Sequence, residues 1–386
     1  MRIPGFFLPL SGTISALLIS LNCRCTSLLV LALSSPEPTR RSFISKSAAT
    51  VATSFSIAPI ANAETAPAVL YPGGSAALPK ASYSEDGAWS PSPELITTSL
   101  GKQRFLTTEL SPLQQILPFG DQELYYAPWL FGSWMVKAQL KNKKYPFGTE
   151  YLPSKSLVEG SPRNRNEQVD DTTTYEAHYF STLANTKANQ VTVNLGLGAP
   201  KTKIIADRAF NAISVNKAYN QLAPVESVDW DYSKDPTKLT LNFGAGLVAE
   251  DMRPLGQRRA EVYLTARTSE EGLDNESGSL TYCTAERSRT VTLAPGNVIV
   301  SDVEHITEFR KVDDDTVTAV SRIAVYLTPN PNSREGVLWQ QVGGKAVAFF
   351  DYKLEMKRQK ESFNMKDGTT MERACVKTPK DVIQCS

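Results

Sequence analysis

The sequence contains two histidines, and each lies within two residues of a carboxylate. His178 follows Glu176, and His305 follows Glu304. A carboxylate beside an imidazole raises the pKa of the imidazole, so both histidines could change charge when their compartment is acidified. The alternative is that both are ordinary histidines on surface strands, without a chemical role.

Familiar catalytic motifs are missing from the sequence. It lacks a Ser-His-Asp elbow, a Walker loop, a dinucleotide fingerprint and a pair of histidines four residues apart. The acidic run of Asp313, Asp314 and Asp315 could bind a cation, but such a run is more often a solvated turn. We therefore expect no metal and no cofactor, assign no catalytic residue, and favour a protein that is not an enzyme.

The cysteines have no spacing typical of a metal site, which argues against zinc. Cys375 and Cys385 lie ten residues apart in a polar tail and could form a disulfide in an oxidising compartment. Such a bond would staple the tail or act as a redox switch, and two free thiols are the alternative. Cys283 lies in a strand-like run and is expected to be a small packed residue.

A twin-arginine export signal is predicted at residues 39–63. Arg40 and Arg41 are followed by Phe43 and a mildly apolar run, and then by the small residues Ala61 and Ala63 at a cleavage site. A second leader, residues 1–38, precedes it, and its two apolar stretches are too short to cross a bilayer. This tandem is typical of import into a plastid followed by transfer to the thylakoid lumen. A third signal, for a plastid with extra membranes, stays open.

Net charge and hydropathy argue against two classes of partner, nucleic acids and the interior of a membrane. The formal net charge is +1, and cleavage after Ala63 would leave a chain close to neutral, without the basic field that nucleic acid requires. The chain beyond that site holds no apolar run long enough for a transmembrane helix. We expect a soluble lumenal protein with at most peripheral membrane contact.

Alternating apolar and polar residues predict many half-buried strands after Trp129. Clear runs cover residues 134–140, 191–197, 228–232, 239–243, 261–267, 317–327 and 348–356, with further strands near Tyr175 and Val300. So many strands with almost no helix between them predict a mostly β fold, as an antiparallel β-barrel or sandwich. One domain over residues 121–358 suffices.

The flanking segments are expected to be simpler. Residues 64–120 form a Pro-, Ser- and Ala-rich linker with one or two short helices toward its end, and residues 359–386 form a polar tail. The one helix expected among the strands covers residues 207–219. At its start, Asp207 and Arg208 predict a structural ion pair, and an anion-binding role for Arg208 is the alternative.

The strongest motif is Gly132-Ser133-Trp134, directly before the first strong strand. This motif resembles the start of the barrel in lipocalins and related calycins. There a glycine allows a tight turn, and a tryptophan plugs one end of the barrel. In that pattern a cation from the last strand packs over the tryptophan. Lys353, Lys357 or Arg358 could supply it.

Residues 121–357 also resemble a family of cyanobacterial and plastid-lumen proteins built on a domain of unknown function. Four blocks carry the likeness: residues 126–134, residues 206–211 with Phe210, residues 324–329 and residues 352–356. Lys353 stands where we would expect arginine. The resemblance implies a lumenal barrel tied to photosynthesis, with no established activity.

Three functions follow as hypotheses. The first is a calycin-like binding module whose inward Trp134, Phe350, Tyr352 and Met356 hold a carotenoid, a lipid or a tetrapyrrole. The second is an auxiliary or assembly factor that binds a photosystem or another thylakoid complex. The third is a lumenal enzyme on a lipocalin-like barrel, which would need acid and base groups inside it.

Overall fold

The computed structural model describes residues 91, 95–114, 123–183, 195, 202–220, 223–247, 254–294, 297–365 and 369–386. The targeting residues Arg40, Arg41, Ala61 and Ala63 lie outside the described residues, as does the predicted strand over 191–197 apart from Leu195.

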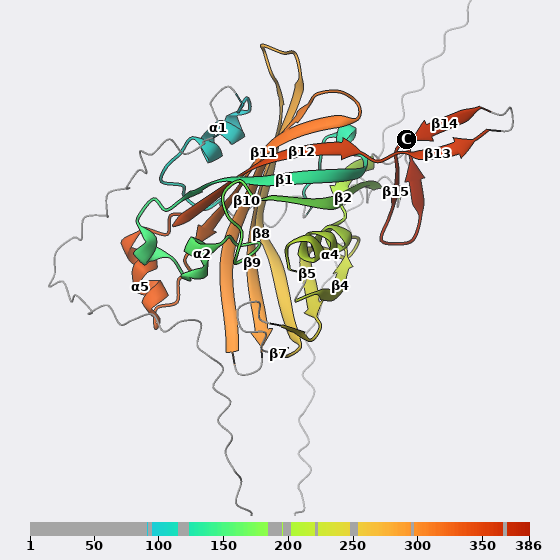
Figure 1. Ribbon diagram of the computed structural model, residues 1–386. Helices are drawn as coiled ribbons and strands as arrows, with labels where there is room; N and C mark the ends of the chain where they lie inside the picture. The colour runs from blue at the N-terminus through green and yellow to red at the C-terminus, as the bar shows by residue number, and fades with distance from the viewer. Residues whose placement is uncertain are drawn as a thin grey trace, which may run out of the picture. The chain divides into compact units, whose positions relative to one another are not determined.

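Ten antiparallel strands form one sheet, in the order β3-β2-β1-β12-β11-β10-β9-β8-β5-β4 (Figure 1). The mostly β prediction is therefore confirmed. The first long strand pairs with the last, because β1 lies beside β12. The bounds are β1 Gly132–Lys144, β2 Thr172–Leu183, β3 Thr202–Ala206, β4 Val225–Asp231, β5 Asp235–Phe243, β8 Arg258–Leu273, β9 Leu280–Ala294, β10 Asn297–Lys311, β11 Thr316–Tyr326 and β12 Ala348–Arg358.

Alternation along each strand sorts the side chains onto two faces of the sheet. In β12, Tyr352, Leu354 and Met356 are buried, whereas Lys353 and Glu355 between them are exposed. The buried set joins a large apolar cluster with residues of β1, β2, β9, β10 and β11, which we call the concave core.

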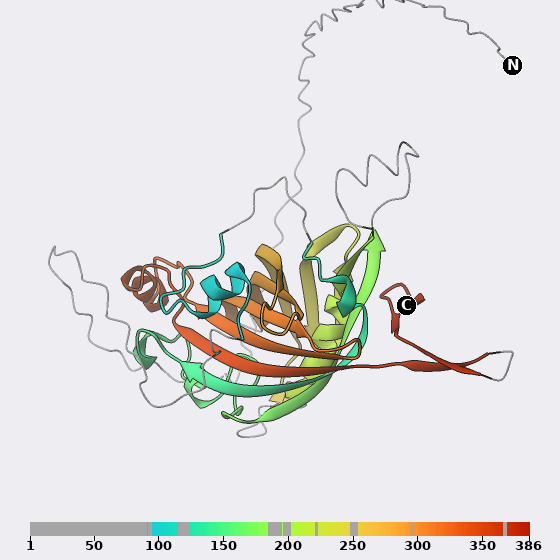
Figure 2. The ribbon, with the colours of Figure 1, turned by 90° about the horizontal axis from the view of Figure 1, so that it is seen from above.

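The sheet is curled (Figure 2), and the aromatic rings of this core meet across the curl. The ring of Tyr126 lies 5.0 Å from the ring of Tyr179 on β2 and 6.4 Å from the ring of Phe309 on β10. Strands β2 and β10 are separated by three others in the sheet, so one ring can bridge them only if the sheet bends around it. The result is a half-barrel with β3 and β4 at its two edges.

Helix α4 (Arg208–Tyr219) packs against both β2 and β4 and so lies between the two ends of the sheet (Figure 1). The helix begins where the Asp207 carboxylate accepts a hydrogen bond from the backbone N–H of Phe210 at 2.9 Å, an N-cap. Asn211 accepts from the N–H of His178 and donates to its carbonyl, and Ser214 accepts from the N–H of Glu176. These side chains of α4 provide hydrogen-bond partners for backbone groups at the edge of β2 that do not pair with β3.

The convex side is covered by the segment before the sheet. Helix α1 (Ser99–Phe105) packs Phe105 over Ile306 and Phe349 in a second apolar cluster. Its N-terminus is held by Glu308, which accepts from both the N–H and the hydroxyl of Thr97 at 2.6 and 2.8 Å. The expected helix near the end of the linker is thus present.

Several short elements complete the described part of the domain. Turns of 3-10 helix cover η1 Pro128–Leu130 and η2 Thr149–Tyr151, and α2 covers Ser156–Glu159. Helix α5 (Arg334–Gln341) follows an N-cap at Ser333 and was not expected from the sequence. Two-residue strands β6 Gly246–Leu247 and β7 Pro254–Leu255 pair with each other.

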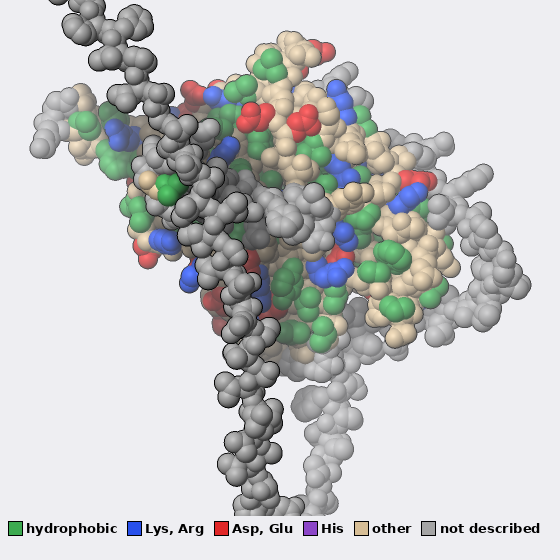
Figure 3. All heavy atoms as spheres, turned by 180° about the vertical axis from the view of Figure 1, so that it is seen from behind, with side chains coloured by type: hydrophobic (Ala, Val, Ile, Leu, Met, Phe, Trp, Pro, Cys, Tyr) green, Lys and Arg blue, Asp and Glu red, His purple; other side chains and the backbone are tan. Residues whose placement is uncertain are grey.

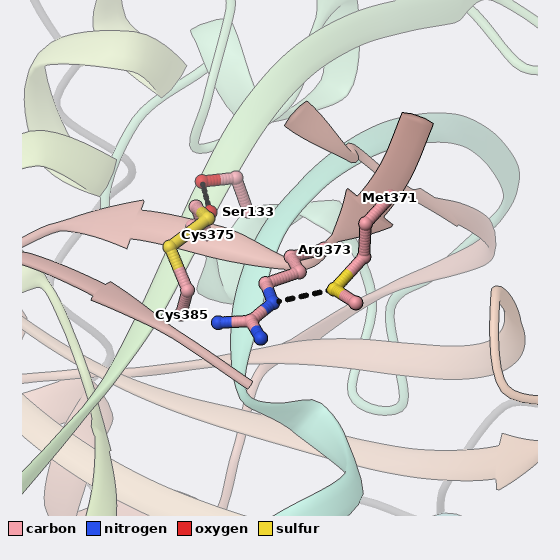
Figure 4. The surroundings of a disulfide bond; sticks show 5 residues. All are labelled: Ser133, Met371, Arg373, Cys375 and Cys385. Carbon is pink, nitrogen blue, oxygen red and sulfur yellow. Dashed lines mark hydrogen bonds between the residues drawn. A yellow bond between two sulfur atoms is a disulfide. The ribbon is translucent and has the colours of Figure 1, made fainter. Parts of the chain in front are cut away.

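The C-terminal segment, predicted as a polar tail, forms two hairpins. Strand β13 (Glu361–Asn364) pairs with β14 (Thr370–Arg373), and β15 (Cys375–Lys377) pairs with β16 (Ile383–Cys385). A disulfide joins Cys375 to Cys385 across the second hairpin (Figure 4). The hydroxyl of Ser133 on β1 donates to the carbonyl of Cys375 at 3.0 Å, which ties this hairpin to the sheet (Figure 4).

The helices of the described residues include none long and apolar enough to cross a bilayer. On the face seen in Figure 3, basic and acidic side chains of the described residues are interspersed. This distribution agrees with the nearly neutral charge of the sequence.

Candidate functional site

Gly132 and Trp134 occupy the start of β1 at one end of the concave core. Gly132 has φ of 114°, a left-handed conformation that favours glycine. Trp134 is fully buried, and its indole N–H donates to the carbonyl of Leu130 at 2.8 Å. The guanidinium of Arg358 lies 4.3 Å from the centre of the Trp134 ring.

The cation over Trp134 is therefore Arg358, and Lys353 does not fill that role. Trp134 pairs directly with Arg358 across β1 and β12, and Arg358 also donates to the carbonyls of Phe131 and Trp129. Lys353 points to the opposite face, where its ammonium lies 3.6 Å from Glu355. Side chains alternate between the two faces along β12, and Lys353 follows Tyr352 directly, so it lies on the face opposite the concave core.

The four residues predicted to touch a guest all belong to the concave core. Trp134, Phe350, Tyr352 and Met356 are at most 1% exposed. Other side chains cover them, so they form the floor beneath the concave face. A guest would first meet the side chains above this floor that keep accessible surface.

Those side chains include a charged row across three neighbouring strands. Arg267 on β8 pairs with Glu286 on β9, and Glu286 pairs with His305 on β10. Cross-strand neighbours of this kind lie side by side on one face of a sheet. The row faces the concave side, because β9 alternates with Tyr282 in the concave core and Cys283 in the convex cluster.

Arg208, the first residue of α4, reaches down to this row. Its guanidinium donates to both carboxylate oxygens of Glu286, at 2.9 and 2.6 Å, and to Glu123 at 3.0 Å. Burial raises the pKa of Glu123, and Arg208 offsets only part of that rise. Burial acts the same way on Glu286, but there Arg208 prevails and the pKa is lowered.

The expected ion pair between Asp207 and Arg208 does not form. Asp207 is the N-cap of α4, and burial raises its pKa. Arg208 points away toward Glu286 and Glu123. Adjacent residues at a helix start project in different directions, so the cap and the cation serve separate partners.

His305 is a half-buried member of the charged row, not a surface histidine. Burial and, to a lesser extent, the charge of Arg163 lower its pKa from 6.5 to about 4, against the opposing charge of Glu286. This direction is opposite to the one expected from the neighbouring Glu304. Glu304 lies on the convex face, where it forms an ion pair with Arg104.

His178 lies outside the charged row. Its ring stacks on Phe210 of α4, with ring centres 3.5 Å apart, and its Nε2 lies 2.9 Å from Glu176. The contact with Glu176 agrees with the sequence pairing. The stacking buries the imidazole between β2 and α4, so His178 is a packing residue.

Arg163 approaches the concave side from the loop between α2 and β2. Its guanidinium lies 4.4 Å from the ring centre of Tyr352 and 5.5 Å from that of Tyr219. It also donates to the Tyr219 hydroxyl at 3.2 Å. The loop closes tightly at Gly160, where a Cβ would come within 2.0 Å of the Arg165 carbonyl oxygen.

The remaining sequence candidates are structural. Cys283 is fully buried beneath α1, as expected, and burial raises its pKa. Asp313, Asp314 and Asp315 form the turn between β10 and β11, and Lys311 and Lys360 pair with this turn. Among the described residues, no group of three or more His, Cys, Asp or Glu could hold a metal ion.

Sequence reasoning missed Arg163, Arg267 and Glu286. The phase of β9 was a usable signal for Glu286, because it shares alternate positions with Tyr282 and Thr284. Arg267 follows a register shift after Leu264, so simple alternation misassigns its face. Arg163 lies in a loop, where periodicity carries no information.

A family model described as "Domain of unknown function (DUF6816)" matches residues 118–360, which include the whole described sheet. No curated protein and no solved structure matches the chain.

Proposed function

The chain belongs to this family of unknown function, so its role must be inferred from its own geometry, and we propose that it is a binding module for a hydrophobic small molecule. The guest would lie on the concave side of the half-barrel, above the floor formed by Trp134, Phe350, Tyr352 and Met356. Concave sites with an apolar lining and few polar groups are the usual form of small-molecule sites.

One observation carries the proposal. Tyr126, Arg163, Arg208, Glu286 and His305 all keep accessible surface. Removal from water is nevertheless the largest influence on the pKa of each of them. These side chains border the concave face of the half-barrel and remain within reach of a guest.

The predicted compartment suggests the class of guest. The twin-arginine leader, with Arg40 and Arg41, supports a place in the thylakoid lumen of a plastid. Carotenoids, lipids and tetrapyrroles are the hydrophobic molecules that photosynthetic membranes offer there. The resemblance of the Gly132 and Trp134 start to lipocalins remains a prediction, and it fits a carrier.

The test is to incubate the full chain, in oxidising buffer, with a detergent extract of thylakoid pigments and lipids. After repurification, the absorption spectrum and a mass-spectrometric lipid scan identify any guest. His305→Trp should reduce the bound amount because the larger side chain would occupy the concave face, whereas Lys353→Trp, on the opposite face, should not. A wild-type protein that emerges empty contradicts the proposal for these guests.

An auxiliary or assembly factor is the second candidate, favoured by one exposed apolar group. The end of the β9–β10 hairpin carries Leu293, Val298, Ile299 and Val300, and Val298 is 60% exposed. Exposed apolar clusters of this kind often mark contacts with a partner. Val298→Asp should then abolish co-purification with thylakoid complexes and leave pigment binding unchanged.

The enzyme hypothesis has weaker support. Glu286 and Glu123 are carboxylates on the concave side, but both are ion-paired with Arg208. An ion-paired carboxylate with a lowered pKa, as at Glu286, is a poor general acid.

A further inference from the structure

Arg163 brings a positive charge to the concave side without a carboxylate to neutralise it. Among the described residues, no Asp or Glu forms an ion pair with this arginine, whereas Arg208 pairs with two. Its contacts are the two tyrosine rings and the Tyr219 hydroxyl. Cation–π contacts supply about 0.5–2 kcal/mol, less than a deeply placed guanidinium loses by leaving water.

A carboxylate from the same loop bonds to groups other than Arg163. Glu167 comes from the same loop, but its Oε2 accepts hydrogen bonds from Ser161 and, at 2.8 Å, from the Tyr352 hydroxyl. Arg163 instead lies over the ring of that tyrosine. The second oxygen of Glu167, Oε1, is buried and has no partner among the described residues. Two side chains of this loop therefore contact different parts of Tyr352: Glu167 accepts from its hydroxyl, and Arg163 lies over its ring.

A second donor on the same side is also unoccupied. Within the described residues, the ring nitrogens of His305 make no hydrogen bond, and the ring is half-buried. Arg163 and His305 are close enough for the charge of the arginine to act on the histidine. A guanidinium without a carboxylate partner and an imidazole without a hydrogen bond, both on the concave side, favour a ligand that brings acceptors.

On the basis of the proposed function, we propose that the guest is an amphiphile with a single carboxylate, which binds to the guanidinium of Arg163 while the apolar body lies over the concave core. The planar guanidinium matches a carboxylate by two parallel hydrogen bonds. The single charge of the Arg163 guanidinium balances one negative charge, so we expect a monoanion to bind there better than a dianionic phosphate. Hydrocarbon carotenoids are thereby disfavoured, and fatty acids or carboxylated tetrapyrroles are favoured.

The experiment compares cis-parinaric acid, a fluorescent fatty acid, with its methyl ester on the full chain, in alkaline buffer where the acid is ionised. We expect the acid to bind about tenfold more tightly than the ester or better, because the ester cannot form the charged hydrogen bonds. Arg163→Gln should lower the affinity for the acid to that for the ester. Arg163→Lys should retain part of the preference, because it keeps the charge and loses the fork.

Arg334→Gln is the matched control, because Arg334 lies on α5 and donates only to the carbonyl of Glu150. Thermal melts of each variant show whether it folds, and the acid–ester comparison on the wild type requires no variant. Equal binding of acid and ester overturns the carboxylate inference and leaves the proposed function standing. Failure of both probes, together with an empty protein after the pigment incubation, overturns the two together. Displacement of the acid by inorganic phosphate alone would show a simple anion site and contradict the amphiphile.

Discussion

At the residue scale, the concave side is defined by charges whose partners come from distant parts of the chain. Arg208 from α4 neutralises Glu286 on β9, and His305 on β10 lies next to that carboxylate. Arg163 brings a guanidinium that pairs with no carboxylate of the described residues. The chemistry proposed for the site depends on this guanidinium and on the imidazole of His305.

The pKa of His305 predicts a loss of stability in acid. The folded protein binds this proton only near pH 4, whereas the unfolded chain binds it near 6.5. Between these values the unfolded state holds more protons, so stability decreases as pH falls through this window. The loss amounts to at most about 3 kcal/mol, and less because solvent reaches part of the ring.

Denaturant unfolding from neutral pH to about pH 4 measures this slope, and His305→Gln should remove most of it. Lys353→Gln, on the opposite face of the sheet, is the control and should retain the slope. Since the chain has two histidines, a proton NMR titration resolves both. An imidazole of His305 that titrates near 6.5 would contradict the burial argument.

At the element scale, α4 and the second C-terminal hairpin complete what the sheet leaves open. Asn211 and Ser214 serve the backbone of β2, and Asn216 accepts from the N–H of Val225 on β4 at 2.8 Å. On the other face of β2, Val376 of the disulfide-linked hairpin packs with Phe180 and Ile205. A helix and a hairpin thus protect the open end of the half-barrel from pairing with other chains.

Asn211→Ala tests the role of α4 at the sheet edge. The change removes the acceptor for the His178 N–H, at 2.7 Å, and the donor for its carbonyl. We expect a loss of about 1–3 kcal/mol in unfolding free energy and faster hydrogen exchange at the His178 amide.

Lys217→Ala, on the exposed side of the same helix, is the matched control and should change stability by less than about 0.5 kcal/mol. If both variants lose equal stability and the His178 amide stays protected, α4 does not satisfy the edge of β2.

At the scale of the whole molecule, the sheet unites the two ends of the matched region. The pairing of β1 with β12 joins residues near both limits of the family match, and α1 and the C-terminal hairpins add to it from outside. The targeting segment lies beyond this part, so the place of action is a prediction of the sequence alone.

Arg40→Lys with Arg41→Lys tests that prediction and preserves charge. Twin-arginine transport requires the arginine pair itself, so the double variant should enter isolated plastids and fail to reach the lumen. Import followed by protease treatment and immunoblotting gives the readout, and Arg24→Lys serves as the control. Accumulation of a processed, protected product from the double variant would exclude this route.

Local features of this protein follow from its sequence alone. Alternation predicted β1, β5, β11 and β12, because a half-buried strand requires period two whatever its neighbours are. The helix over 207–219 was predicted as well, and the disulfide between Cys375 and Cys385 was one of two alternatives; both depend on residues close in the chain. Only the kind of element and its buried face follow from such patterns.

The tertiary structure decided which residues meet. Register placed Arg358, and not Lys353, over Trp134, and the curl of the sheet placed Tyr126 between β2 and β10. The convergence of Arg163 and Arg208 on one concave face depends on a loop and a helix start, whose directions periodicity does not describe. These contacts depend on how distant strands pair. Local patterns in a single sequence do not reveal the register of that pairing.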